Sequence, residues 1–196
     1  MDLEVELDKY LRIRTNGRDD SNSNFVNYPY EATPYSVLQY LSQSGHILKK
    51  DKIIDYGCGK GRVSFFLAYS TKAKMIGVEY DERLYNRALE NSENAISSSR
   101  VSFVLSDAKE YKVPLDSTGA YFFNPFSLDV LKSVINNILE SKKENSRDFK
   151  LFFYYPSKEY IEYLDSNSSI KNIEDIDCMD LFNNGDKREI IKVYII

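Results

Sequence analysis

Apolar and polar positions alternate along most of this chain in an order that predicts strands separated by helices. Short runs of β-branched and aromatic residues predict strands at Lys52–Tyr56, Lys74–Tyr80, Val101–Leu105, Gly119–Phe123 and Leu151–Tyr155. Apolar residues at helical spacing between them predict helices at Arg62–Ser70, Glu82 to about Ala95, Leu128–Glu140 and Lys158–Leu164. The last two apolar runs, Ile173–Leu181 and Arg188–Ile196, leave no room for a helix between them, so we expect an antiparallel pair.

This alternation predicts the fold class. Strands with helices between them favour an α/β three-layer sandwich around a mostly parallel sheet, here of seven strands with one antiparallel edge strand. The first 45 residues do not fit the alternation: Tyr35–Ser44 predicts one helix, and the part before it is a polar, tyrosine-rich lead-in. We therefore expect a single compact domain, in which residues 46–196 form the sheet and residues 1–45 cap its binding site.

Composition limits the chemistry that such a fold could carry out. The chain has 196 residues, with 30 acidic and 26 basic side chains, a formal charge of -4, two Cys and one His. This set cannot build a zinc site from cysteines and histidines and leaves few ways to assemble a catalytic triad, so no metal site is expected. The absence of a long apolar run and of an export signal predicts a soluble, cytoplasmic protein with no membrane partner. The acidic balance does not favour nucleic acid as a partner.

The segment Asp55–Gly61, with the sequence DYGCGKG, lies between the first predicted strand and the helix that follows it. Glycines at alternate positions let the backbone turn sharply and approach a ligand, and the helix N-terminus offers N–H groups to an anion. A P-loop is excluded because the glycine and hydroxyl residues that it requires are missing. A dinucleotide fingerprint requires a small residue at position 62, which is Arg62, so that class of site is disfavoured. A tight turn between strand and helix stays open as the purely structural alternative.

A third pattern, an acidic residue followed by three alternating glycines, is complete from Asp55 to Gly61, and acidic residues follow the next two strands at Glu79 and Asp107. With these residues and the sequence NPF at 124–126, the chain resembles the class I S-adenosylmethionine-dependent methyltransferases. Glu79 follows Asp55 by 24 residues, near the offset of about 20 expected for an acid that binds ribose.

The resemblance implies S-adenosylmethionine as the cofactor, with the glycine loop at its methionyl and ribose end, Glu79 at the ribose hydroxyls and Asp107 at the adenine. The cofactor-binding residues expected on this basis are Thr33, Asp55, Gly57, Cys58, Gly59, Gly61, Glu79, Tyr80, Asp107 and Ala108. Glu79 and Asp107 could instead be ordinary caps at strand ends.

The fourth motif of the resemblance concerns the methyl acceptor. In amine-methylating branches of the family it reads Asn or Asp, two prolines and an aromatic residue, and it holds the target nitrogen and stacks on the substrate. The resemblance therefore implies that Asn124, Pro125 and Phe126 position an amino nitrogen without a strong base. This sequence has one proline in place of two, which leaves an oxygen or carbon acceptor open. Asn124-Pro125 could also be a plain turn, and Phe126 a core residue.

The lead-in contains Thr33-Pro34 directly before the first predicted helix. It resembles the segment before the first motif in some nucleic-acid amino-methyltransferases, where the backbone reaches the methionyl carboxylate of the cofactor. Thr33 would also make a helix N-cap, with Pro34 at the first helical position. Three tyrosines of the same segment, Tyr28, Tyr30 and Tyr35, could stack on a flat acceptor or pack on the sheet.

These features together predict an S-adenosylmethionine-dependent methyltransferase with an amino nitrogen as its target. The sequence does not separate RNA, DNA, protein and small molecules as acceptors, and it does not indicate an oligomeric state. Because the fourth motif is incomplete and no separate substrate domain is expected, a non-catalytic subunit that binds S-adenosylmethionine or another nucleoside is an alternative. A nucleotide-dependent oxidoreductase is a third reading, which depends only on the general α/β pattern.

Overall fold

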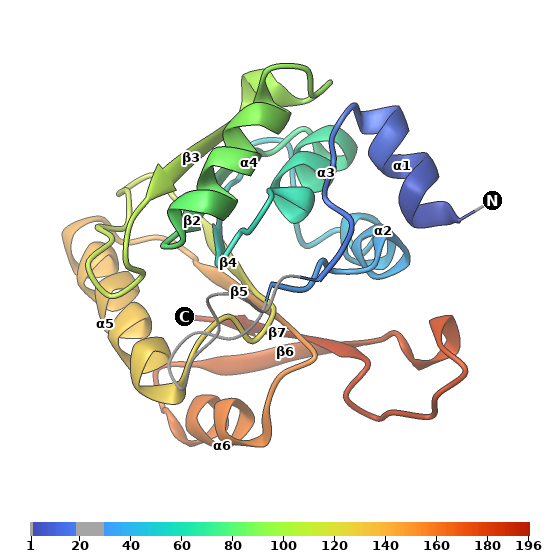
Figure 1. Ribbon diagram of the computed structural model, residues 1–196. Helices are drawn as coiled ribbons and strands as arrows, with labels where there is room; N and C mark the ends of the chain where they lie inside the picture. The colour runs from blue at the N-terminus through green and yellow to red at the C-terminus, as the bar shows by residue number, and fades with distance from the viewer. Residues whose placement is uncertain (1, 19–29) are drawn as a thin grey trace.

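The computed structural model describes residues 2–18 and 30–196, which form a seven-stranded sheet with helices on both faces (Figure 1). The strands are β1 (Lys52–Tyr56), β2 (Lys74–Glu79), β3 (Val101–Leu105), β4 (Gly119–Phe122), β5 (Lys150–Tyr154), β6 (Lys171–Asp177) and β7 (Ile190–Ile195). They lie in the order β3-β2-β1-β4-β5-β7-β6. Neighbours from β3 to β5 are parallel, and β7 is antiparallel to both β5 and β6. The predicted fold class is thus confirmed, and the reversed strand is the inner member of the hairpin at the sheet edge.

Two core clusters join the helices to opposite faces of the sheet. On one face, α2 (Tyr35–Gln43) and α3 (Arg62–Thr71) pack against the strands. On the other face, α5 (Leu128–Glu144) and α6 (Lys158–Ser166) do the same. The remaining helix of the sheet region, α4 (Glu82–Ser92), packs on β3 and β2. Each of these helices begins within a residue of its predicted start, because apolar periodicity and turn residues mark helix starts well.

The side chains of strand β1 point alternately into the two core clusters, and one of them is the buried carboxyl group of Asp55. Successive side chains of a strand point to opposite faces, so Ile53 joins the cluster with α2 and α3, while Ile54 and Tyr56 join the cluster with α5 and α6. Asp55 faces α3, where the Ser64 hydroxyl donates a hydrogen bond to it at 2.8 Å. The acidic residue that opens the glycine motif is therefore part of the strand and is fixed by the helix that follows the loop.

The strand order also determines where a ligand site can form. The chain leaves the central strand β1 toward β2 and β3 and then returns to β4 on the other side of β1. Open α/β sheets bind ligands outside the carboxyl ends of their strands, at the point where the strand order reverses. Here that point lies between β1 and β4.

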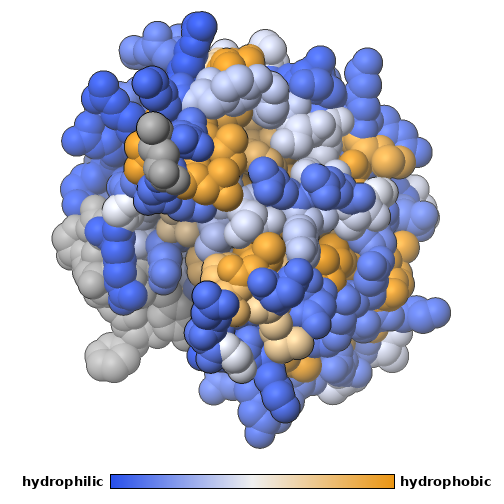
Figure 2. Space-filling view, turned by 90° about the vertical axis from the view of Figure 1, so that its right-hand side faces the viewer, coloured by the Kyte–Doolittle hydropathy of each residue, from blue (hydrophilic) through white to orange (hydrophobic). Residues whose placement is uncertain are grey.

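The N-terminal lead-in is more regular than the sequence predicts, because it contains the helix α1 (Leu3–Leu11). The side chain of Asp2 caps α1 by accepting a hydrogen bond from the backbone N–H of Glu4 at 3.0 Å. Figure 2 shows the side of the molecule that carries α1, where apolar side chains form separate patches between charged and polar ones. Within residues 2–18 and 30–196, no helix combines the length and the apolar character needed to cross a bilayer.

Two further details of the prediction are corrected. The N-cap role of Thr33 is wrong: the residue before α2 is Pro34, no side chain caps the helix, and Thr33 Oγ1 instead lies 3.0 Å from the hydroxyl of Tyr121. The late strand expected to run to Leu181 ends at Asp177, because residues 179–181 form a 3₁₀ turn.

Candidate functional site

The loop between β1 and α3 has a backbone conformation that favours glycine. Gly57, Gly59 and Gly61 have φ angles of 71°, 54° and 88°. A Cβ at Gly57 would lie 2.5 Å from the Cβ of Pro125, and a Cβ at Gly59 would lie 2.2 Å from the ring of Tyr30. The glycines therefore allow the loop to turn, and they also leave room for two side chains to pack against its backbone. These side chains are Pro125 of the fourth motif and Tyr30 of the lead-in.

The carboxylate of Glu79, at the end of β2, is held by backbone N–H groups. Its Oε2 accepts a hydrogen bond from Gly59 N at 2.8 Å, and its Oε1 accepts from Tyr80 N and Asp81 N, both at 2.9 Å. Burial raises the pKa of this carboxyl, and the three N–H donors partly offset the effect. A carboxylate offers about four acceptor sites, so Glu79 keeps capacity for a further donor from the pocket.

Asp55 is buried at the end of β1, next to Glu79. Burial raises the pKa of the Asp55 carboxyl to about 7; the hydrogen bond from Ser64 lowers it, and the charge of Glu79 raises it again. Burial also raises the pKa of the neighbouring Cys58 thiol, with Asp55 and Glu79 adding to the effect. Two carboxyl groups and a thiol that resists ionisation thus lie at the base of the glycine loop.

One pocket extends along the carboxyl ends of β1, β2 and β3 and contains most of the predicted cofactor-binding residues. Those that line it are Thr33, Asp55, Gly57, Cys58, Glu79, Tyr80, Asp107 and Ala108. Gly59 and Gly61 shape the loop without lining the pocket. Asp107 lies at its β3 end with a side chain that is 45% exposed and 3.5 Å from Lys109 Nζ. The pocket therefore has buried carboxyl groups at its centre and an exposed one at its end.

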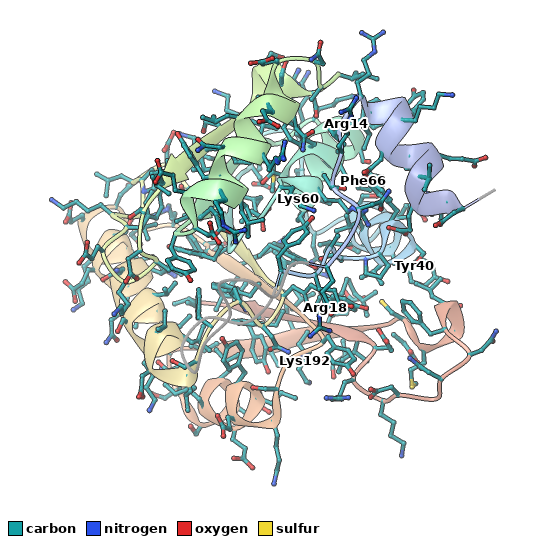
Figure 3. All side chains as sticks on the ribbon, viewed as in Figure 1. Arg14, Arg18, Tyr40, Lys60, Phe66 and Lys192 are labelled. Atoms are coloured by element: carbon teal, nitrogen blue, oxygen red, sulfur yellow. The ribbon has the colours of Figure 1, made fainter. Side chains whose placement is uncertain are left out.

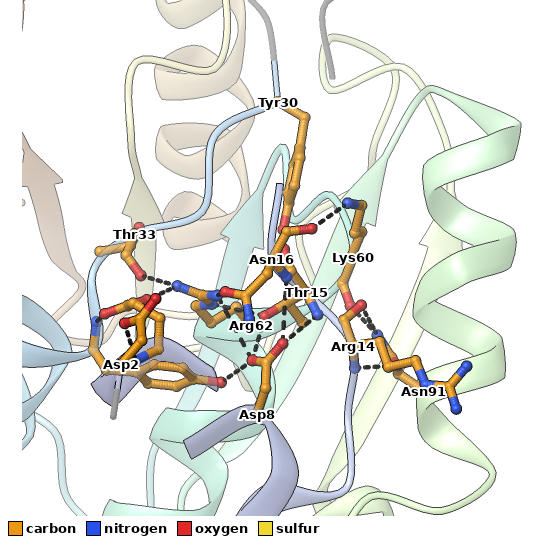
Figure 4. A network of polar contacts seen from close by, with 12 residues as sticks. Asp2, Asp8, Arg14, Thr15, Asn16, Tyr30, Thr33, Lys60, Arg62 and Asn91 are labelled. Atoms are coloured by element: carbon orange, nitrogen blue, oxygen red, sulfur yellow. Dashed lines mark hydrogen bonds and ion pairs between the residues drawn. The ribbon is translucent and has the colours of Figure 1, made fainter. Parts of the chain in front are cut away.

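The lead-in forms one wall of this pocket. Residues 30–33 line it, and the Tyr30 hydroxyl donates a hydrogen bond to the carbonyl of Thr15 at 2.7 Å. Lys60 Nζ lies 4.8 Å from the centre of the Tyr30 ring (Figure 4). Of the other two tyrosines considered for stacking, Tyr35 is buried in the core and donates a hydrogen bond to Asp8, and Tyr28 lies outside the described residues.

Arg62, the first residue of α3, joins this wall to the sheet domain (Figure 4). Its side chain is 4% exposed, and its guanidinium lies 4.4 Å from the centre of the Tyr35 ring. Its hydrogen-bond and ion-pair partners are Glu4, Asp8, Thr15, Asn16 and the carbonyl of Thr33. Asp8 is itself buried and accepts a hydrogen bond from the Tyr35 hydroxyl at 2.6 Å. A buried charge network therefore ties α1 and the lead-in to the first turn after the glycine loop.

Asn124, the first residue of the fourth motif, is engaged by the protein's own backbone. Its Oδ1 accepts a hydrogen bond from Ser157 N at 3.1 Å, and its Nδ2 donates to the carbonyl of Tyr155. Asn124 and Tyr155 have left-handed φ angles of 39° and 51°. The amide links the ends of β4 and β5 and does not line this pocket, so its role in positioning an acceptor stays a prediction.

The other two residues of the motif lie in different environments. Pro125 lines the pocket and packs against the glycine loop. Phe126 also borders the pocket, but it is 3% exposed and packs edge-to-face against Tyr56 and Phe122 in the core under α5. These contacts are those of a core residue.

A second groove lies beside the pocket, and Glu31 and Phe123 line both. We call it the aromatic groove; its aromatic walls are Phe123, Tyr154, Tyr155 and Phe182. Its charged residues are Glu31, Glu189 and Arg18, and Figure 3 shows Arg18 between the N-terminal segment and the C-terminal strands. Apart from Asn124 and Pro34, which also border it, the sequence interpretation assigned a role to none of these residues.

Two signals for the missed residues were present in the sequence. Arg62 departs from the dinucleotide fingerprint, and Glu4 and Asp8, which precede it on one helix, are the acidic partners that a buried arginine needs. Phe123 directly precedes the fourth motif and could have been considered with it. The residues of β7 and its preceding loop carry no motif.

Comparison with known proteins decides the family. A family model described as a methyltransferase domain matches residues 47–147. The chain belongs to this methyltransferase family. A protein-lysine N-methyltransferase of Saccharolobus islandicus (strain REY15A) is 26% identical to this methyltransferase domain over 141 residues, which cover 71% of this chain and 87% of that protein.

Solved structures share the fold of this methyltransferase domain. An RNA methyltransferase from Salinibacter ruber in complex with S-adenosyl-L-homocysteine has a TM-score of 0.56 at 18% identity, covering 84% of this chain and 92% of that chain. A human methyltransferase 10 domain containing protein has a TM-score of 0.60 at 14% identity, covering 97% of this chain and 92% of that chain. The resemblance to class I methyltransferases is thus confirmed for family and fold.

Proposed function

We propose that this methyltransferase domain binds S-adenosylmethionine in the pocket along β1, β2 and β3 and transfers its methyl group to an amino nitrogen. The observation that carries the proposal is the Glu79 carboxylate, which is buried at the strand end and oriented by three backbone N–H groups beside the glycine loop. A ribose with two adjacent hydroxyls requires such a fixed acceptor. The Salinibacter ruber methyltransferase of the same fold was crystallised with S-adenosyl-L-homocysteine.

The residues present fit the parts of this cofactor. Glu79 would accept hydrogen bonds from the ribose hydroxyls, and Asp107 would accept from the adenine amino group. Gly57 and Cys58 of the glycine loop line the pocket and would border the methionyl part. S-adenosylmethionine supplies a methyl group bonded to a positively charged sulfur, so the protein's own residues have to bind, orient and exclude water rather than provide a strong base.

Two observations support an amino nitrogen as the target. The relative from Saccharolobus islandicus is named a protein-lysine N-methyltransferase. The chain has a single His, which suits a reaction that depends on alignment more than on a basic side chain. The two free, buried cysteines, Cys58 and Cys178, agree with a reducing, cytoplasmic location, which we also propose.

Isothermal titration calorimetry with S-adenosylhomocysteine tests the cofactor site. We expect the wild type to bind and Glu79→Gln to bind about tenfold or more weakly, because a charge-assisted acceptor is lost. Glu93→Gln is the matched control, since Glu93 is an exposed carboxylate at the end of α4, and it should bind like the wild type. Absence of binding by the wild type up to about 1 mM ligand would overturn the proposal. Binding without methyl transfer to any acceptor would favour the non-catalytic subunit instead.

A further inference from the structure

The aromatic groove has walls suited to a cation. The ring centres of Phe123 and Tyr154 are 4.8 Å apart, and those of Tyr154 and Tyr155 are 6.1 Å apart, so three rings border one space. The faces of aromatic rings carry negative potential and attract ammonium and guanidinium groups. Tyr155 already shows this chemistry, because the guanidinium of Arg188 lies 4.3 Å from its ring centre.

A buried carboxylate borders the same groove. Glu189 is 7% exposed, and its oxygens accept hydrogen bonds from the Tyr154 hydroxyl at 2.6 Å and from Asn184 Nδ2 at 3.2 Å. Both donors are neutral, and in the part of the chain that the structure describes no basic side chain forms an ion pair with Glu189. A buried charge without an opposite charge is costly, and a cationic ligand in the groove would offset that cost.

The groove adjoins the pocket along β1, β2 and β3. Glu31 and Phe123 line both cavities, and Phe123 directly follows β4, at the end of the pocket opposite to Asp107. A side chain that enters the groove therefore reaches the wall of the pocket on its β4 side. The adenine end of the cofactor site lies away from this contact.

We infer that the aromatic groove admits the methyl acceptor and that the acceptor is a lysine side chain of a protein. The inference rests on the proposed function, and it names the substrate class of that site. The rings and Glu189 would attract and orient the ammonium group, whereas Glu31, where the groove meets the pocket, already pairs with Arg18 at 3.9 Å. A nucleic acid is disfavoured, because its phosphates would meet the buried carboxylate of Glu189 on a chain of formal charge -4.

The reaction at this site balances without a further reagent. The lysine ammonium first gives one proton to water, since only the neutral amine carries a lone pair. The nitrogen then forms a bond to the methyl carbon, the bond between that carbon and sulfur breaks, and its electron pair stays on sulfur. The products are a methylated ammonium and an uncharged thioether.

The test uses the full chain with radiolabelled S-adenosylmethionine and two probes. The probes are a synthetic peptide library with one lysine in each random sequence and a mixed-sequence RNA oligonucleotide. After hydrolysis, methylated residues are identified by chromatography, and we expect methyl-lysine from the peptides. Methylated nucleosides in place of methyl-lysine would overturn the inference, and so would the absence of methyl-lysine from a protein that binds S-adenosylhomocysteine normally.

Variants of the groove connect the product to the geometry. Phe182→Leu removes a ring while keeping an apolar side chain, and Glu189→Gln removes the charge while keeping an acceptor for Tyr154. Each should raise the KM for the peptides about three- to tenfold and leave the affinity for S-adenosylhomocysteine unchanged, since cation–π and buried ion contacts contribute at that level. Tyr10→Leu, at an exposed ring on α1, and Glu93→Gln are the matched controls and should match the wild type.

These measurements separate the two claims. Unchanged KM values in Phe182→Leu and Glu189→Gln would overturn the groove as the acceptor site. A wild type that fails to bind S-adenosylhomocysteine in calorimetry would overturn the proposed function itself, and that result is obtained without any acceptor.

Discussion

The two halves of the carboxyl edge of the sheet use their polar side chains in different ways. On the β1–β3 side, Glu79 and Asp55 line the pocket, held by neighbouring backbone and by Ser64. On the β4–β5 side, the corresponding polar residue, Asn124, is bonded to Tyr155 and Ser157, and aromatic rings form the adjacent groove. The first half therefore presents carboxylate groups to a pocket, whereas in the second half the amide of Asn124 holds the ends of β4 and β5 together.

The difference shows where a sequence motif can be trusted for function. Glu79 bonds to its own two successors in the chain and to the glycine loop, so its environment follows from the motif itself. The partners of Asn124 lie more than 30 residues further along the chain, as the sequence separations of 31 and 33 residues show. Tertiary contacts of that kind decide whether an amide is available to a substrate.

The largest expected effect concerns Arg62, which ties the N-terminal wall to the first half of the site. Arg62→Met leaves Glu4 and Asp8 without their buried cation, so we expect the free energy of unfolding to fall by about 3–5 kcal/mol. Urea denaturation followed by circular dichroism measures the change. Arg87→Met is the control, because the Arg87 side chain is 65% exposed and pairs only with Glu90. Equal stability of the two variants would mean that the wall is not held by this network.

A smaller effect tests the buried acid of the first half by its pH dependence. The pKa of Asp55 is raised from 3.8 to about 7, so the folded state binds this proton more tightly than the unfolded chain does. The contribution of Asp55 to stability therefore falls as pH rises from about 4 to about 7 and stays low above that range. Asp55→Asn does not ionise and keeps an acceptor for Ser64. Its free energy of unfolding should therefore rise relative to that of the wild type by about 1 kcal/mol per pH unit within this range.

The measurement for Asp55 is urea denaturation of both proteins at several pH values across that range. Asp129→Asn is the control, because the Asp129 side chain is 94% exposed and pairs with Lys132 on the helix surface. This variant should show no such pH-dependent increase in stability. A constant difference between Asp55→Asn and the wild type at all pH values would contradict the role of burial. Some pH dependence remains in the variant, because the pKa of Glu79 is raised as well.

The smallest effect concerns the contact between the two halves, where Gly57 of the glycine loop lies against Pro125. Gly57 and Gly45 have similar φ angles of 71° and 77°, but a Cβ at Gly57 would lie 2.5 Å from Pro125, whereas nothing lies within 4 Å at Gly45. Both Ala variants lose the ease of the left-handed conformation, about 1 kcal/mol. Gly57→Ala should lose about 1–3 kcal/mol more, because it forces the loop away from Pro125. If thermal or urea unfolding shows equal losses of stability in Gly57→Ala and Gly45→Ala, the contact between the loop and Pro125 does not contribute to stability.

The sequence predicted the sheet, and it predicted residues that the structure brings together around one pocket, for physical reasons that can be named. Buried strands read as continuous apolar runs, and a glycine loop followed by acids at strand ends has few other uses. Helix α1 was missed because LEVELDKYL mixes charge and apolar residues, although Asp2 as N-cap, acids in the first turn and Lys9 in the last turn are its signals. Phe182 and Glu189 lie in the connection between β6 and β7 and line the groove. No local sequence pattern predicts that they lie there.

A crystal structure with S-adenosylhomocysteine bound tests the contrast between the two halves most directly. We predict that the ligand lies along the ends of β1, β2 and β3 with its ribose on Glu79, while Asn124 keeps its hydrogen bonds to Tyr155 and Ser157. A ligand bound elsewhere, or an Asn124 amide that has left both backbone partners and points into the cofactor pocket, would contradict the account.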